Sequence, residues 1–199
     1  MKVPPLVMLV GLIVRTGTAQ SAPAVVLYLD NPEQRYCIGD EDIGWVQISS
    51  RFRYQNTSSD AFLLLRHAHQ VDYVGLWRTM QDRSAKPDYN TSFTSVTGVL
   101  NQEPQLSEND FVRLNPNGDY SQKASFSFPY KKAGRHIPGN IPGDGTYWAA
   151  VHVSLWDSTE EYAAKLQKLF HSPPIWTQPL WSQRIRVEVH SDAKARGCP

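Results

Sequence analysis

Apolar and polar residues alternate along several short stretches of this chain, and residues that favour turns separate the stretches. The clearest case is residues 46–54, where four large apolar side chains alternate with Gln47, Arg51 and Arg53. Because successive side chains of a β-strand point to opposite faces, this pattern predicts a strand with one buried and one wet face. Similar stretches predict further strands at residues 24–29, 61–73, 93–100, 111–114, 120–128, 147–155 and 185–189.

One helix is predicted before the last strand. Ser158 and Glu161 fit the capping box, in which two side chains at a helix start bond otherwise unpaired backbone amides. The predicted helix runs to about Phe170, and Pro173 with Pro174 ends it. Its apolar residues form one stripe, which we expect to pack against the strands; they are Tyr162, Leu166, Leu169 and Phe170.

Residues 143–149, with the sequence GDGTYWA, resemble the tyrosine corner of immunoglobulin-like domains. Gly145 stands two residues before Tyr147, as in that pattern, but the usual aspartate is displaced to Asp144. Ala149 also stands where antibody domains have their inter-sheet cysteine. The chain therefore resembles the broad immunoglobulin-like and fibronectin III-like architecture of exported proteins, and not the antibody family. The resemblance implies an all-β fold, an immunoglobulin-like antiparallel β-sandwich with one short helix inserted before the last strand, and it implies no activity.

The start of the chain predicts export. An apolar segment of about a dozen residues is too short to cross a bilayer, and small residues follow it at Gly17 and Ala19. We expect residues 1–19 to be a cleaved signal peptide. Residues 20–199 would then be a single domain, secreted or periplasmic, whose residues 191–199 form a flexible tail.

Charge and hydropathy narrow the choice of partner. The chain has 20 basic and 19 acidic residues, and loss of Lys2 and Arg15 with the signal peptide leaves 18 basic residues against the same 19. Such a balance argues against a nucleic-acid partner, which requires a basic surface. No later apolar run is long enough for a membrane span. The expected partner is a protein or another extracellular macromolecule.

Both cysteines, Cys37 and Cys198, remain after removal of the signal peptide. Because an exported protein meets an oxidising compartment, we predict a disulfide between them. The resemblance supports this pairing, since the first and last strands of such sandwiches often run side by side in parallel. Two unpaired thiols, or a Cys198 that pairs with another chain, are the alternatives.

His67 and His69 share one face of the predicted strand because they are two residues apart. Two imidazoles from one strand can share a metal ion, so a small metal-binding protein or metalloenzyme is an alternative function. A zinc site needs at least a third protein ligand, and the other histidines are spread over separate elements. We therefore prefer a structural role for both rings, and we predict no cofactor.

Six tryptophans are many for a chain of 199 residues, and exposed aromatic rings bind sugars and peptides. Trp148 and Trp156 have the strand parity opposite to the apolar positions, and Trp176 follows the two prolines after the helix. These three are candidate binding residues, with core packing as the alternative for each.

Two long connections flank the strand at residues 147–155. Residues 131–145 are too rich in glycine and proline for regular structure, and they contain Arg135 and His136. Because rigid sandwiches usually carry function on their loops, we expect this loop and the insertion at residues 157–176 to form the binding surface.

The leading interpretation is a non-catalytic domain that binds a protein or another macromolecule through these loops. The chain has no Gly-x-Ser-x-Gly elbow, His-Glu-x-x-His helix, phosphate-binding glycine loop or Cys-x-x-Cys pair, which lowers the expectation of an enzyme without excluding one. A carbohydrate-binding module that uses exposed tryptophans is a third possibility. Glycosylation sequons begin at Asn56 and Asn90, both in predicted loops, and would matter in a eukaryotic host.

Overall fold

A computed structural model describes residues 24–39, 41–66, 70–80, 86–92, 105–135, 141–156 and 158–194. The described chain is mostly strand, its strands pair antiparallel, and α1 (Glu160–Phe170) is its one α-helix, which confirms the predicted all-β class. The strands are β1 (Val25–Cys37), β2 (Ile43–Asn56), β3 (Phe62–Leu65), β4 (Gln70–Trp77), β5 (Tyr89–Ser92), β6 (Phe111–Leu114), β7 (Asp119–Lys131), β8 (Gly145–Ser154), β9 (Leu180–Trp181) and β10 (Ile185–Val189). A short 3-10 helix, η1 (Glu108–Asp110), precedes β6.

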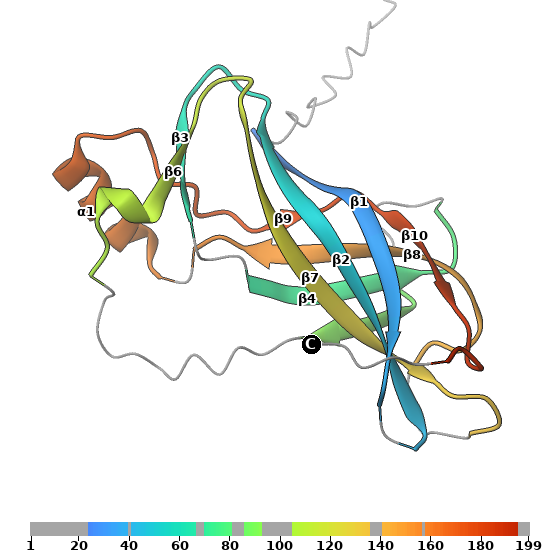
Figure 1. Ribbon diagram of the computed structural model, residues 1–199. Helices are drawn as coiled ribbons and strands as arrows, with labels where there is room; N and C mark the ends of the chain where they lie inside the picture. Colours follow the sequence, from blue (N-terminus) through green and yellow to red (C-terminus); the bar gives the residue numbers. More distant parts are fainter. Residues whose placement is uncertain are drawn as a thin grey trace, which may run out of the picture.

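The three longest strands form one sheet in the order β1-β2-β7 (Figure 1). Strand β2 shows the predicted alternation, since every second residue from Gly44 to Asn56 is buried. Strand β1 alternates likewise as far as Asn31, whose φ of 52° lies in the left-handed region and produces a β-bulge against β2. The extra residue reverses the parity of β1, so that Gln34 and Tyr36 turn toward the second sheet.

The second sheet has the order β10-β8-β4-β5, and β9 pairs with β8 next to β10. Asp72 forms a bulge in β4, because Val71 pairs with Val153 and Tyr73 with the preceding residue, His152. Strand β5 begins within a stretch expected to be loop, and the edge strand predicted at residues 93–100 lies outside the described residues.

The main hydrophobic core lies between these two sheets, and both contribute large buried side chains to it. Burial in this core changes the pKa of its tyrosines. Burial raises the pKa of four phenol groups above the ordinary value, because a phenolate would lose its hydration there. They are Tyr36, Tyr54, Tyr130 and Tyr147.

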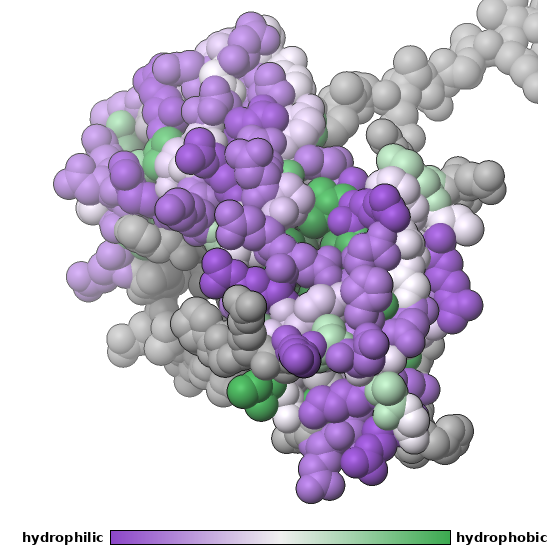
Figure 2. Space-filling model, turned by 45° about the vertical axis from the view of Figure 1, so that its right-hand side comes forward, coloured by the Kyte–Doolittle hydropathy of each residue, from purple (hydrophilic) through white to green (hydrophobic). Residues whose placement is uncertain are grey.

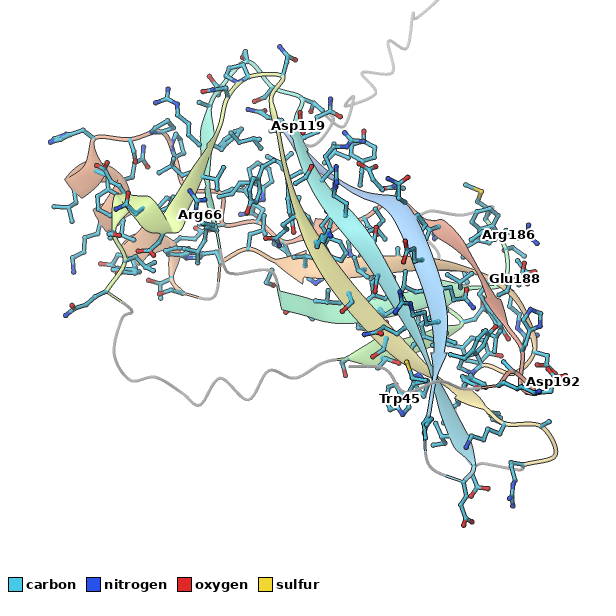
Figure 3. The ribbon with its side chains drawn as sticks, viewed as in Figure 1. Trp45, Arg66, Asp119, Arg186, Glu188 and Asp192 are labelled. Carbon is cyan, nitrogen blue, oxygen red and sulfur yellow. The ribbon has the colours of Figure 1, made fainter. Side chains whose placement is uncertain are left out.

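Glutamine side chains join the edges of the two sheets. The amide of Gln34 accepts a hydrogen bond from Glu188 N at 3.1 Å and donates one to Glu188 O, as a neighbouring strand would. Gln183 does the same for Leu29, at 3.1 Å to its N–H and 3.5 Å to its carbonyl. Strands β1 and β10 therefore lie side by side in parallel, as expected, and glutamine side chains bridge their edges at two places. On β10, Arg186 and Glu188 form an ion pair at 2.6 Å (Figure 3).

A second hydrophobic cluster lies beside α1, where β3 and β6 form a separate two-stranded sheet (Figure 1). Trp156 belongs to this cluster: its ring stacks on Tyr162 with centroids 5.9 Å apart, and its Nε1 donates to Thr159 O at 3.0 Å. The helix insertion thus has a core of its own, formed by Leu63, Leu65, Phe111, Trp156, Tyr162, Ala163, Leu166 and Ile175.

Helix α1 begins one residue later than predicted. Thr159 is the N-cap, and its Oγ1 accepts a hydrogen bond from Tyr162 N at 3.1 Å, so the predicted capping box of Ser158 and Glu161 is wrong. His171 ends the helix in the left-handed conformation with a φ of 48°. Leu169 was expected in the buried stripe but is 66% exposed.

The predicted strand at residues 61–73 is two strands in two sheets. Strand β3 pairs with β6, whereas β4 pairs with β8 and β5. An alternating pattern cannot reveal this division, because strand partners are chosen by tertiary contacts.

Among the described residues, no helix has the length and apolar character to cross a membrane. The predicted signal peptide lies outside the described residues, as do residues 195–199 of the expected tail. Export therefore stays a prediction.

Candidate functional site

The outer face of the second sheet carries a group of ring-bearing side chains. Across β4 and β8, Tyr73 pairs with His152 and Trp77 with Trp148, and His152 pairs in turn with Trp181 on β9. Because these residues alternate with buried residues of the same strands, they lie on the face that points away from the main core. We call these five residues the outer aromatic surface.

Trp181 is the most exposed member of the outer aromatic surface, with 47% of its area accessible. Its ring centroid lies 5.1 Å from that of His152, 5.5 Å from that of Tyr73 and 6.2 Å from that of Trp77. All three contacts are tilted or edge-on, the geometry that aromatic pairs prefer. Because its neighbours already hold the ring, a ligand that covers it loses little to the ordering of this side chain.

Trp77 is almost fully buried within the outer aromatic surface, and its ring contacts the ring of Trp181. Gly75 makes room for it: a Cβ at this position would lie 2.6 Å from the Trp77 ring. The guanidinium carbon of Arg184 lies 4.0 Å from the centroid of the same ring, a favourable cation–π distance.

Two polar side chains, Asp72 and Ser154, lie next to His152 of the outer aromatic surface. The carboxylate of Asp72 accepts a hydrogen bond from Ser154 Oγ and lies 3.4 Å from His152 Nδ1. In a catalytic triad the imidazole stands between the hydroxyl and the carboxylate, whereas here the carboxylate stands between the other two groups. The hydroxyl proton is directed at Asp72 and not at His152, so the order of the groups differs from that of a triad.

Exposed apolar side chains elsewhere are isolated. Ile38, Met80 and Leu169 are the other large exposed hydrophobics among the described residues. The face in Figure 2 is mostly hydrophilic, with only small hydrophobic patches. Single exposed apolar residues are normal on soluble proteins, whereas Trp181 belongs to a contiguous group of rings.

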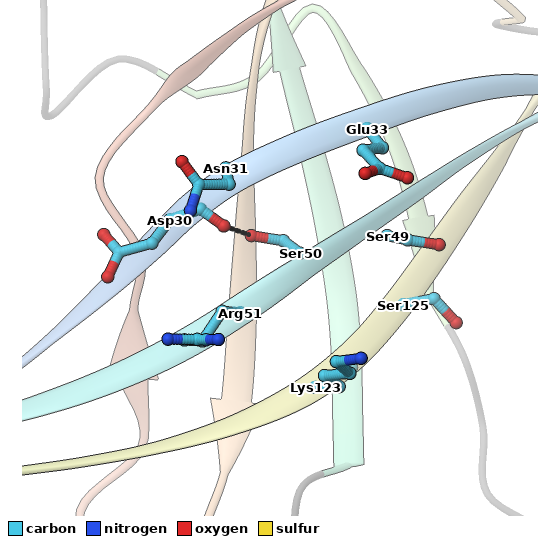
Figure 4. Close-up of a pocket in the computed structure, with 9 residues that line it drawn as sticks. Asp30, Asn31, Glu33, Ser49, Ser50, Arg51, Lys123 and Ser125 are labelled. Atoms are coloured by element: carbon cyan, nitrogen blue, oxygen red, sulfur yellow. Dashed lines mark hydrogen bonds between the residues drawn. The ribbon is translucent and has the colours of Figure 1, made fainter.

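A hollow of about 500 Å³ lies on the opposite side of the molecule, on the outer face of the first sheet (Figure 4). It opens beside the bulge of β1, and its lining is polar. The lining residues are Asp30, Asn31, Glu33, Ser49, Ser50, Arg51, Lys123, Ala124 and Ser125.

The three tryptophans predicted from the sequence to be binding residues differ in burial and position. Trp148 lies half-buried on the outer aromatic surface. Trp156 is only 7% exposed and packs beneath α1, so it is not available to a partner. Trp176 is half-buried, with its ring 5.2 Å from that of Phe62 and its Nε1 bonded to Gln178 O at 2.7 Å, which are the contacts of a structural anchor.

The two segments expected to form one binding surface lie at opposite ends of β8, as Figure 1 shows. The loop ends where β8 begins and the insertion starts where β8 ends, about 30 Å away for a strand of this length. Arg135 is exposed and forms an ion pair with Asp42 at 3.2 Å, whereas His136 lies outside the described residues. The described residues of the two segments are therefore far apart, and their joint role in binding stays a prediction.

The metal and disulfide predictions remain open. His67 and His69 lie outside the described residues, and the described part of the chain contains no group of three His, Cys, Asp or Glu side chains placed to hold a metal ion. Cys37 is buried at the end of β1, but Cys198 also lies outside the described residues.

The two sequons differ sharply. Asn56 ends β2 and is fully buried, not in a loop, and its amide donates hydrogen bonds to the backbone oxygens of Asp60, Leu114 and Asn115. This engaged side chain is closed to a glycan in the folded protein. Asn90 is exposed on β5 and remains open to modification.

Sequence reasoning missed Trp181 and Tyr73 as surface residues. Tyr73 and Trp77 carry a signal, since they alternate with Val74 and Leu76 along β4. Trp181 carries none, because β9 has only two residues and no pattern of its own. No protein-family model, curated protein or solved structure matches this chain.

Proposed function

We propose that this protein is an exported, non-catalytic domain of immunoglobulin-like architecture that binds another macromolecule through the outer aromatic surface. The observation that carries the proposal is the half-exposed Trp181 ring, held in place by three other rings. Tryptophan, tyrosine and arginine are the residues most enriched where binding energy concentrates at interfaces.

Two contacts support the immunoglobulin-like architecture. The hydroxyl of Tyr147 donates to the carbonyl oxygen of Gly143, four residues earlier, at 2.9 Å, which is the bond that a tyrosine corner makes. The parallel neighbourhood of β1 and β10 also fits the first and last strands of such a sandwich.

The exposed part of Trp181 sets the scale of the binding energy. A tryptophan buries up to about 250 Å², so covering the 47% that is still accessible removes roughly 100 Å² from water. At about 20 cal/mol per Å², the low end of the usual range because part of the indole is polar, this contributes about 2 kcal/mol. Truncation to alanine should therefore weaken binding roughly 30-fold.

A second candidate is carbohydrate binding by the same surface. The polar trio of Asp72, His152 and Ser154 lies beside the exposed ring, and sugars are recognised by aromatic faces together with hydrogen-bonding groups. The two candidates share Trp181 and differ in the ligand, so one variant tests both.

The test compares the mature wild-type protein with Trp181→Ala in two arms. One arm is an array of defined glycans, and the other is affinity capture from the extracellular and cell-surface fraction of the host. A ligand that wild type retains and Trp181→Ala loses supports the proposal, and the arm in which it is found decides between sugar and protein. Leu169→Ala, which removes an exposed apolar side chain on α1, is the control and should behave as wild type.

If every ligand found bound Trp181→Ala as well as wild type, the outer aromatic surface would not be the binding site. Circular dichroism and thermal unfolding of both variants establish that each is folded, since a half-exposed residue of a two-residue strand is not expected to be essential for the core.

A further inference from the structure

The hollow on the first sheet is organised by the register of its three strands. In one row across the outer face, Asp30 pairs with Arg51 and Arg51 pairs with Lys123. In the next row, Glu33 pairs with Ser49 and Ser49 pairs with Ser125. The bulge in β1 separates the two rows on that strand, and the hollow opens where they meet.

Arg51 and Lys123 are two positive charges placed directly opposite each other on neighbouring strands. Like charges in this relation destabilise a sheet, because their side chains lie only about 5 Å apart at Cβ. Both side chains are exposed, and within the described part of the chain neither has an acidic side chain within ion-pair distance.

The carboxylate in the same row does not compensate for these charges. Asp30 receives two hydrogen bonds from Arg53, from Nε at 2.6 Å and from a terminal nitrogen at 3.3 Å. This hydrogen-bonded carboxylate raises the pKa of Arg53. The guanidinium of Arg53 also lies 4.4 Å from the ring centroid of Tyr28, so this pair is fixed on the far side of the row. Glu33, the other carboxylate in the lining of the hollow, lies 3.6 Å from the guanidinium of Arg35.

Hydroxyl groups complete the lining. Ser49 and Ser125 are cross-strand neighbours next to the two cations, and among the described residues their side chains make no hydrogen bond. Two cations and two hydroxyl donors at the rim of one hollow match an anion with several acceptor oxygens. We propose that this hollow binds a tetrahedral oxyanion, a phosphate or sulfate group, between Arg51 and Lys123.

The test is an NMR titration of the mature protein at constant ionic strength and pH 7 with inorganic phosphate, inorganic sulfate, O-phosphoserine and acetate. The expected result is saturable shifts of the backbone amides around Arg51 and Lys123 with phosphate or sulfate, and weaker shifts with acetate. Tighter binding of O-phosphoserine than of inorganic phosphate would identify an ester group of a larger ligand as the source, and the reverse order a free ion.

Arg51→Gln and Lys123→Gln should each weaken binding about tenfold, the loss of one charge-assisted contact. Lys131→Gln is the matched control, because it removes the same charge from the same strand at its far end, outside the hollow. Absence of saturable shifts in the wild type, or equal losses in Lys131→Gln and Lys123→Gln, would overturn the proposal. Because Arg51 and Lys123 are exposed and Lys131 is only half-buried at the end of its strand, the variants should keep the wild-type fold.

Discussion

Asn56 is expected to be the polar side chain on which the fold depends most. It is 0% exposed and lies where β2 ends and the chain turns toward β3. Its Nδ2 donates to Asp60 O at 2.6 Å, Asn115 O at 3.1 Å and Leu114 O at 3.3 Å. Its Oδ1 accepts from the backbone and hydroxyl of Ser58, at 2.9 and 2.8 Å.

Asn56→Ala removes all of these contacts and leaves the buried carbonyl of Leu114 without this donor. The groups of Ser58 and Asp60 are nearer the surface, where water replaces part of the loss. With about 1 kcal/mol for each hydrogen bond and an added penalty for the buried carbonyl, we expect a loss of about 3 kcal/mol. For a domain of this size that lowers Tm by roughly 6 to 12 °C.

Urea unfolding followed by tryptophan fluorescence measures this loss, with Asn90→Ala as the control. Asn90 is an exposed asparagine in the other sequon, and its removal should change stability by less than about 0.5 kcal/mol. A loss below about 1 kcal/mol for Asn56→Ala would refute the reasoning.

The loss of stability caused by Asn56→Asp should depend on pH. Ser58 can still donate to one oxygen of the introduced carboxylate, but the oxygen that replaces Nδ2 faces three carbonyl oxygens. Burial against these acceptors raises the pKa of the introduced carboxyl above its unfolded value near 4. The destabilisation should therefore be smallest below pH about 4 and grow as the pH rises, the sign required for a raised folded pKa.

Further predictions concern the core and the chain ends. Tyr147→Phe removes the bond to Gly143 and should cost about 1 kcal/mol in the same urea assay; no loss would contradict a role for that bond. Peptide mapping of protein exported by its own host should find Cys37 joined to Cys198, and Cys198→Ser should lower stability by about 2 to 5 kcal/mol. The disulfide prediction fails if both thiols are free. Burial, partial in the case of Tyr36, raises the pKa of four tyrosines, so the stability they confer is present below pH about 10 and lost as the pH rises further. An absorbance titration in which all tyrosines ionise near pH 10 in still-folded protein would contradict this.

Local patterns allowed much of the fold to be predicted. Strand β2 could be predicted because its alternation of buried and more accessible residues is unbroken. Strand β8 and helix α1 could be predicted because the periodic pattern of each lies within its own sequence. The bulges at Asn31 and Asp72 could not be predicted, because a bulge is defined by the pairing of two strands and produces no pattern in the sequence of either strand alone.

The binding surface was harder to predict than the fold. Strand parity correctly separated Trp148 from Tyr147, but it misplaced Trp156, since the burial of that ring depends on α1 and β3 folding over it. Trp181 reaches the outer face only because β9 adds to the edge of β8, a tertiary event. The hollow at Arg51 and Lys123 likewise follows from the register of three strands.

The affinity of the Trp181→Ala variant for the ligand found by capture or array tests the central claim most directly. Titration of the purified ligand into wild type, Trp181→Ala and Leu169→Ala should give a Kd raised roughly 30-fold by Trp181→Ala and left within about twofold by Leu169→Ala. Equal Kd values for wild type and Trp181→Ala would contradict the claim that this protein binds through the outer aromatic surface.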